Sequence, residues 1–269
     1  MSFSDLLGKS DHFRAGGNNC IRKVRGENLA IKIYMSSKAN AFWNEIQFLT
    51  EARKVGCENV PRVYGSWERI PAISMDFIEG KQAELDERYI NAYLNFLERL
   101  RLIPLRGYQR SASEGARSTS EFYKLVNNKL DVLCDLASKS ELKKLQTAIA
   151  DIRSRLSGSK LHFSVVPSDS GIHNTILDSY ARLWFIDFEH GGIDALELEL
   201  SKWVNQPLMN LDFGARCSLL EHAFQEIGIL ADVELWVAAG ALFWALIRFR
   251  RNGDFVESIG STGVFDKVL

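Results

Sequence analysis

The stretch that decides the fold is Pro167-Ser-Asp-Ser-Gly-Ile-His-Asn174, and Asp187-Phe-Glu189 begins thirteen residues after its last residue. Short apolar runs before and between these motifs predict strands. A hairpin of this length would bring Asn174 and Asp187 together, giving two oxygen ligands for a hard cation such as Mg²⁺. Asp169 would then lie at the mouth of the turn, where its carboxylate could accept a proton.

An alternating strand and an amphipathic helix near the N-terminus supply two further charged residues. Residues 28–34 alternate, which places the small Ala30 and the charged Lys32 on the same face of a strand. The following segment, 38–54, has helical periodicity, and Glu45 lies on or beside its apolar stripe. Two further strands are expected at 60–67 and 70–78. The sequence therefore predicts a strand lysine and a helix glutamate in one small sheet domain.

A glycine turn precedes these elements. It comprises Gly16, Gly17, Asn18 and Asn19, and it is suited to bringing backbone N–H groups close to phosphate. Along the chain, the sequence therefore contains, in this order, a glycine turn, a strand lysine, a helix glutamate, an Asp–Asn loop and a second aspartate. The protein-kinase fold has its parts in the same order and at comparable spacings.

On these residues the sequence resembles the aminoglycoside phosphotransferase and choline kinase superfamily of small-molecule kinases, from about Phe13 to Pro207. The resemblance implies an α+β, bilobal, protein-kinase-like fold. Residues 1–80 would form a nucleotide-binding N-lobe, a small antiparallel sheet with one helix that ends in a hinge. Residues 81–269 would form a larger, mostly helical C-lobe with the catalytic loop and the acceptor site.

The resemblance also implies a reaction and roles for the residues. ATP or GTP would bind with Mg²⁺, and the γ-phosphate would move to a hydroxyl of a small molecule. Asp169 would be the catalytic base, Asn174 and Asp187 would hold the metal, and Lys32, fixed by Glu45, would hold the α- and β-phosphates. The nucleotide would further contact Gly16, Gly17, Asn18, Asn19 and the hinge residues Asp76 and Ile78.

One departure from the family pattern leaves alternatives open. The family usually has a histidine two residues before the catalytic aspartate, and here that residue is Pro167. This favours, as an alternative, a catalytically weak nucleotide-binding module similar to a pseudokinase, although His173 could partly replace the missing side chain. Protein-kinase activity is disfavoured, because Asp187-Phe is followed by Glu189 and no Ala-Pro-Glu segment follows. For Glu189 and His190 a structural role is favoured over contact with metal or acceptor.

The composition excludes several other classes of protein. The chain has 33 Lys plus Arg and 34 Asp plus Glu, so a nucleic-acid partner is not expected. Four widely spaced cysteines indicate reduced thiols. The longest apolar run, 235–247, is too short to span a bilayer, and the N-terminus has no pattern of a signal peptide. We expect a cytoplasmic monomer or homodimer that does not bind membranes.

The sequence after the hinge is mostly helical in its periodicity. Helices are expected over 86–102, from the capping box at Ser118, over 142–156 and from about Leu196 onward, with short strands at 161–166, 175–177 and 183–187.

The acceptor is only broadly constrained by the sequence. From His190 to the end there are eleven acids and six bases, which could concentrate a cationic acceptor such as an aminosugar or choline-like amine. Acidic, solvated helix faces explain the same excess and are preferred. Trp203, Trp236 and Trp244 could stack on a ligand, but the apolar periodicity favours core packing for the last two. The expected acceptor is an aminoglycoside, an amino alcohol or a sugar-like molecule.

Overall fold

The structure is a computed structural model and describes residues 2–15, 19–35, 39–109, 111–112, 115–139, 143–169 and 171–260. The chain forms two compact units, of which the first comprises residues 1–113 and 167–192 and the second 114–166 and 193–269. Because the chain returns to the first unit at Pro167, the Asp169–Asn174 loop and Asp187 belong to the same unit as Lys32.

The division into compact units does not coincide with the predicted lobe boundary at residue 80. Two later elements join the first unit: strand β6 (Gly80–Gln82) pairs with β8 (Thr175–Asp178), and helix α3 (Glu87–Leu100) contributes Phe96 to its core. The assignment of nucleotide binding to residues 1–80 stays a prediction.

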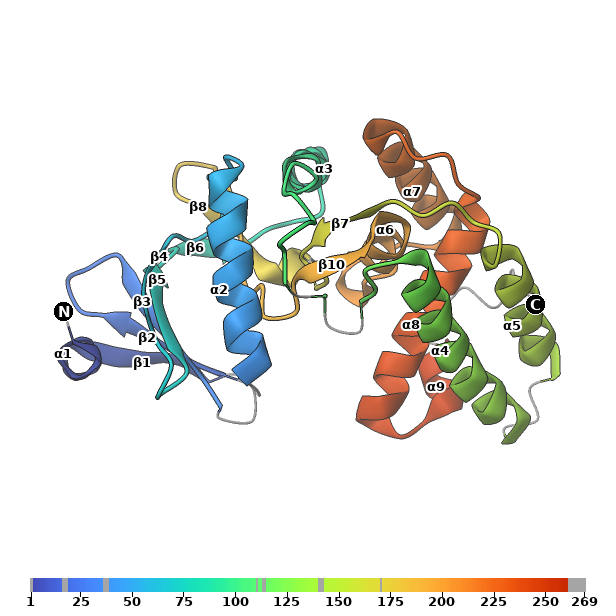
Figure 1. The fold of residues 1–269 in the computed structure, drawn as a ribbon, viewed down its shortest axis with the longest axis horizontal. Coiled ribbons are helices and arrows are strands. Elements are labelled where there is room, and N and C mark those ends of the chain that lie inside the picture. Colours follow the sequence, from blue (N-terminus) through green and yellow to red (C-terminus); the bar gives the residue numbers. More distant parts are fainter. Residues whose placement is uncertain are drawn as a thin grey trace. The chain divides into compact units, whose positions relative to one another are not determined.

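The main sheet of the first unit has five antiparallel strands in the order β1-β2-β3-β5-β4 (Figure 1). The strands are β1 (Ser10–Ala15), β2 (Asn19–Val24), β3 (Leu29–Tyr34), β4 (Val63–Trp67) and β5 (Ala72–Asp76). The three strands predicted from the sequence correspond to β3, β4 and β5, and Asn19, the last residue of the predicted glycine turn, begins β2. The antiparallel sheet is therefore confirmed.

The two faces of this sheet are covered by different helices. Ile31 faces a small apolar cluster with Leu6 of α1 (Phe3–Gly8), a short helix that the sequence analysis did not predict. Lys32 faces the opposite side and bonds to Glu45 of α2 (Ala39–Lys54). This helix lies across the sheet from α1 (Figure 1). The described part of the first eighty residues therefore contains a helix on each face of the sheet, where one helix was expected.

Helix α2 follows the predicted stripe closely. Phe42, Glu45, Leu49 and Ala52 are buried, and their spacing of three and four residues lines one face of a helix. The helix ends at Lys54, two residues before Gly56. Gly56 has φ +82°, a left-handed conformation, and its N–H donates to the carbonyl of Arg53. A glycine in this conformation commonly closes a helix, and the observed end at Lys54 agrees with the predicted range of 38–54.

A second, three-stranded sheet in the first unit has the order β6-β8-β9, with β9 at Leu183–Phe185. The hairpin between β8 and β9 is organised by Asp178. Its carboxylate accepts hydrogen bonds from the N–H groups of Tyr180 and Arg182, from Arg182 Nε and from Trp184 Nε1, at 2.8 to 2.9 Å. Burial alone would raise the pKa of Asp178, but these hydrogen bonds outweigh it and lower the pKa to about 2.

We therefore expect Asp178→Asn to lower the urea midpoint of unfolding at pH 7. Because the folded-state pKa lies below the ordinary 3.8, the stabilisation is complete above that value and is lost as the pH falls toward 2. The difference in midpoint between the wild type and the variant should be smaller at pH 3 than at pH 7. A difference that stays constant over this range would contradict the assignment.

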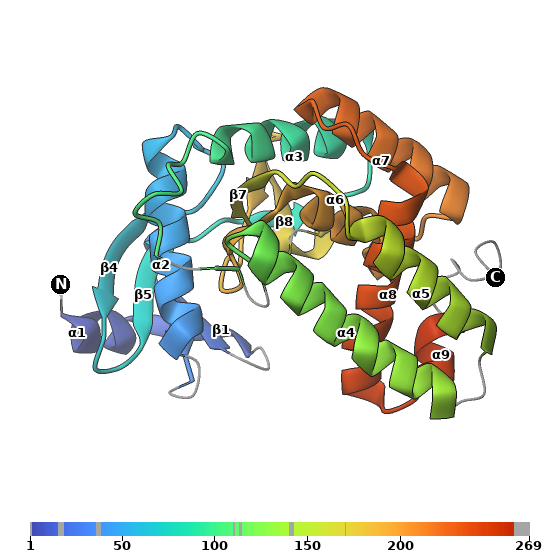
Figure 2. The same ribbon diagram turned by 45° about the vertical axis from the view of Figure 1, so that its right-hand side comes forward.

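The second unit is mostly helical, as predicted. Its elements are α4 (Thr119–Lys139), α5 (Lys143–Leu156), β7 (Phe163–Val166), β10 (Gly192–Ala195), α6 (Leu196–Val204), α7 (Phe213–Ile227), α8 (Val233–Asn252) and α9 (Phe255–Gly260). Helices α4 and α5 lie side by side (Figure 2). The long apolar run falls within α8 and is largely buried, and no helix among the described residues is long and apolar enough to cross a membrane.

Candidate functional site

The centre of the candidate site is a buried ion pair between a strand and a helix of the first unit. Lys32 Nζ on β3 donates to Glu45 Oε2 on α2 at 2.6 Å, and both side chains are almost fully buried. Tyr34, two residues further along the same face of β3, donates its hydroxyl to the same oxygen. The structure thus brings together the strand lysine and the helix glutamate that the sequence predicted as a pair.

Asp187 reaches the same lysine from the segment after β9. Its Oδ1 accepts from Lys32 Nζ at 2.6 Å, while its side chain remains 40% exposed. The next residue, Phe188, is buried and stacks on Phe48 of α2 with ring centroids 4.3 Å apart. Asp187 itself has φ +66°, a left-handed conformation that is uncommon for a residue other than glycine. The buried Phe188 therefore anchors a strained turn that presents Asp187 to Lys32.

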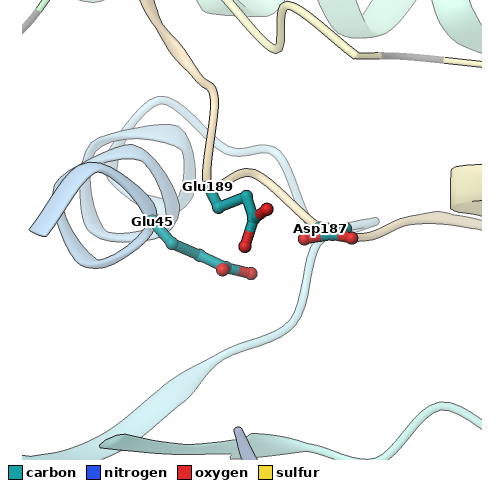
Figure 3. Close-up of side chains that lie close together, drawn as sticks. All are labelled: Glu45, Asp187 and Glu189. Carbon is teal, nitrogen blue, oxygen red and sulfur yellow. The ribbon is translucent and has the colours of Figure 1, made fainter. Parts of the chain in front are cut away.

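Three carboxylates lie close to the ammonium group of Lys32. Oxygens of Glu45, Asp187 and Glu189 lie within 4.8 Å of one another, and Figure 3 shows the three side chains converging. These three groups carry a formal excess of two negative charges over Lys32 when all are ionised. Carboxylate oxygens are the ligands that Mg²⁺ prefers, and the partly exposed Asp187 has a second oxygen beyond the one that Lys32 engages. An oxygen of Asp187 therefore fits a divalent cation, whereas the buried Glu45 and Glu189 are bonded to other side chains.

Burial and charge together fix the ionisation of the central groups. Burial alone would lower the pKa of Lys32, but the charges of Glu45 and Asp187 outweigh it and raise that pKa above its ordinary value. Burial raises the pKa of Glu45, against the opposing charge of Lys32. Burial and the neighbouring Glu45 raise the pKa of Tyr34 well above its ordinary value. Lys32 is thus a cation, and Tyr34 a neutral hydrogen-bond donor, at neutral pH.

The Asp169–Asn174 loop precedes β8 in the same unit. Asn174 Nδ2 donates to the carbonyl of Asp169 at 2.8 Å, and the carbonyl of Asn174 accepts from the N–H of Ile186 at 2.9 Å. The second bond places the backbone of Asn174 beside the residue that precedes Asp187, as the predicted hairpin requires. The Asp169 side chain is 36% exposed, and His173 Nε2 lies 3.5 Å from its Oδ1.

The predicted nucleotide-binding residues are placed only in part. Gly16, Gly17 and Asn18 lie outside the described residues, whereas Asn19 begins β2. At the predicted hinge, the N–H of Asp76 donates to the carbonyl of Arg62, and the Asp76 carboxylate accepts from the N–H of Arg62. The N–H and the carboxylate of Asp76 are thus engaged within the protein, and contact of Asp76 and Ile78 with a nucleotide stays a prediction.

The acidic excess of the C-terminal segment has a structural explanation in the second unit. Asp194 and Glu199 are buried and lie 3.6 and 3.5 Å from Lys202 Nζ. Glu197 is also buried and accepts from the backbone and the ring of His162. These three acids therefore organise the interior of the unit. For them, the preferred explanation of solvated helix faces is wrong.

Two of the three tryptophans considered for ligand stacking are core residues. Trp203 and Trp236 are at most 2% exposed. Trp244 is partly buried, and its indole N–H donates to the carbonyl of Lys202 at 2.8 Å. Core packing, which the periodicity favoured for Trp236 and Trp244, is confirmed for Trp236 and extends to Trp203.

Comparison of the whole chain with solved structures gives clear similarities. A choline/ethanolamine kinase family protein from Mesorhizobium loti has a TM-score of 0.61 at 18% identity, over 96% of this chain and 86% of that one. The streptomycin–ATP–APH(2″)-IIa ternary complex has a TM-score of 0.66 at 14% identity, over 97% and 94%. The GDP complex of wild-type aminoglycoside 2′-phosphotransferase-IIIa has a TM-score of 0.67 at 14% identity, over 96% and 93%.

The chain has the fold of the choline kinases and aminoglycoside phosphotransferases. The resemblance stated from the sequence motifs is thereby confirmed at the level of the fold. No protein-family model and no curated protein matches the sequence. The similarity is therefore carried by the arrangement of the elements.

Within this kinase-like fold, the structure adds residues that the sequence analysis did not assign to the site. Tyr34 bonds to Glu45, and Asn44 Nδ2 donates to the carbonyl of Glu189 at 3.3 Å. Asn19 donates its Nδ2 to Glu189 Oε2 at 2.8 Å, and its predicted contact with nucleotide stays a prediction. The alternation of β3 already placed Tyr34 on the face of Lys32 and gave a usable signal. No comparable local pattern indicated Asn44.

The buried pair allows a direct test of stability. Lys32→Ala leaves the Glu45 carboxylate buried without its cation, so we expect a loss of about 3–5 kcal/mol in the free energy of unfolding. Lys38, at the start of the predicted helix 38–54, would be the nearest exposed control, but it lies outside the described residues. Lys54 serves as the control, because its side chain is 63% exposed and pairs with Glu51 at the surface. Lys54→Ala should cost less than about 1 kcal/mol. Equal losses in urea denaturation would contradict the buried pairing.

Proposed function

We propose that this chain is a phosphotransferase that moves the γ-phosphate of ATP or GTP to a hydroxyl group of a small molecule. The observation that carries the proposal is the buried Lys32 held between Glu45 and Asp187, in the unit that also contains the Asp169–Asn174 loop. The kinase-like fold supports it, since these residues occur in the order that phosphoryl transfer in this fold requires.

The positive charges needed at the phosphates would come from two sources. Lys32, protonated and fixed by Glu45, would bind phosphate oxygens. Mg²⁺, held by Asp187 and Asn174, would neutralise charge that develops on the transferred group. Asp187 would have to share its carboxylate between Lys32 and the metal, which its partial exposure permits. Catalysis would then rest mainly on positioning and electrostatic stabilisation.

Asp169 would orient the acceptor hydroxyl and take its proton. The family histidine that usually braces this loop is replaced by Pro167, and His173 lies 3.5 Å from the Asp169 carboxylate. His173 would hold the Asp169 carboxylate in position through this contact, from the C-terminal end of the loop. This contact favours retained catalysis over the pseudokinase alternative.

The acceptor would be an aminoglycoside, an amino alcohol or a sugar-like molecule. The compared structures include an aminoglycoside complex with ATP and a complex with GDP, so both nucleotides belong in the test. The experiment is a panel of aminoglycosides, choline, ethanolamine, homoserine and sugars, read by release of nucleoside diphosphate with ATP and with GTP. Acceptor-dependent release that requires Mg²⁺ would support the proposal. Nucleotide binding without turnover on any acceptor would favour the pseudokinase alternative.

A further inference from the structure

Glu189 is a buried carboxylate at the position after Asp187-Phe188. Its side chain is 6% exposed, and Oε2 accepts from Asn19 Nδ2 at 2.8 Å and lies 3.9 Å from Lys32 Nζ. His190 Nε2 lies 3.4 Å from the other oxygen, Oε1. Because a buried carboxylate is costly unless it is paired or hydrogen-bonded, these contacts indicate a defined role for this side chain.

The contacts of Glu189 connect the start of β2 with the buried Lys32–Glu45 pair. Asn19 and Tyr34 are partners in the ladder between β2 and β3. Tyr34 and Lys32 both bond to Glu45, and Glu189 lies beside Lys32 and bonds back to Asn19. The start of β2 is therefore connected to the buried ion pair by its backbone and also by a side chain from a segment 170 residues away.

The segment that carries Glu189 is itself held in place by α2. Asn44 Nδ2 bonds to the carbonyl of Glu189, and the N–H of Phe188 lies 3.4 Å from Glu45 Oε1. Phe188 is buried against Phe48. Glu189 thus projects from a fixed backbone, so its bond to Asn19 can restrain the strand.

We infer that Glu189 is a positioning residue that fixes the start of β2 over the Lys32–Glu45 pair through its hydrogen bond to Asn19. The inference rests on the proposed phosphotransferase function. Glu189 influences nucleotide affinity through the position of β2. The variant Glu189→Gln retains an oxygen that can accept from Asn19, so it should keep the nucleotide affinity of the wild type. Its replacement by alanine leaves the Asn19 amide without this acceptor.

The first measurement needs no nucleotide. Hydrogen–deuterium exchange of the β2 amides is compared for the wild type, Glu189→Ala, Glu189→Gln, Asn19→Ala and the control Glu27→Ala, which changes an exposed residue in the β2–β3 turn. We expect faster exchange in Glu189→Ala and Asn19→Ala by roughly five- to tenfold, the effect of losing one hydrogen bond. Glu189→Gln and the control should resemble the wild type.

The second measurement is nucleotide affinity by calorimetry and, where there is turnover, KM and kcat. Glu189→Ala and Asn19→Ala should weaken nucleotide binding by a similar factor, and the double variant should be no weaker than either single one. If Glu189→Gln is as impaired as Glu189→Ala while Asn19→Ala matches the wild type, the carboxylate acts by its charge and the inference is wrong. A wild type that binds no nucleotide refutes the proposed function, whereas unchanged β2 exchange in both alanine variants refutes the positioning role alone.

Discussion

Asp187→Asn should reduce phosphotransfer by about a thousandfold or more, because a metal ligand contributes several kcal/mol to stabilising the transition state. The substitution removes the negative charge of Asp187 and so weakens the hold of this residue on Mg²⁺. The fold should survive, since the Asn side chain can still accept from Lys32 and asparagine tolerates the left-handed φ of +66° at this position.

The measurement is release of nucleoside diphosphate on the best acceptor across a range of Mg²⁺ concentrations, with the melting temperature as a check on folding. Asp151→Asn is the matched control, because Asp151 is 60% exposed and pairs with Arg155 at the surface of α5. The control should retain wild-type turnover. Turnover of Asp187→Asn within threefold of the wild type would refute the metal assignment.

The individual strands and helices could be predicted because they carry strong local patterns, whereas the bilobal fold was implied by the family resemblance. The alternation of β3 and the apolar stripe of α2 are short-range signals that burial confirms at Ile31, Phe42 and Leu49. Helix α1 escaped prediction because its six residues are too few to show periodicity, and only Leu6 in it is buried. Its place in the fold is decided by packing on the sheet, which no local pattern encodes.

The site was predictable where function constrains both residue type and spacing. Lys32 and Glu45 could be paired in advance because kinase-like motifs specify their order, and their side chains do meet. The bond between Asp187 and Lys32 was not predicted. The sequence analysis favoured a structural role for Glu189 and did not reveal that this side chain lies close to Lys32. That closeness depends on how the buried Phe188 orients the turn. Such a contact is tertiary, and spacing along the chain does not reveal it.

In the second unit, the count of charged residues did not predict the charge of a ligand. The acids of the C-terminal segment include Asp194 and Glu199, which are buried beside Lys202, so their net charge says little about a ligand. Burial raises the pKa of Asp194, against the opposing charge of Lys202. A formal charge predicts an electrostatic field only when the structure shows which charges are compensated.

Asp169→Asn should lower turnover by roughly 10²–10⁴-fold, the range typical of a lost general base, with nucleotide affinity nearly unchanged. Asn174 bonds to the backbone carbonyl of Asp169, and the substitution leaves this contact of the loop in place. Asparagine also retains an oxygen that can accept from His173, which lies 3.5 Å from the carboxylate. The variant therefore removes the proton acceptor and its charge while preserving the loop.

Calorimetry of nucleotide binding and release of nucleoside diphosphate should be measured on both forms with the best acceptor. In a working kinase only the release of nucleoside diphosphate falls, because in the proposed mechanism Asp169 contacts the acceptor hydroxyl rather than the nucleotide. A pseudokinase has no turnover to lose, and its ligand binding survives the substitution. If the wild type turns over and the Asn variant matches it, Asp169 is not the base, and the proton must leave the acceptor by another route.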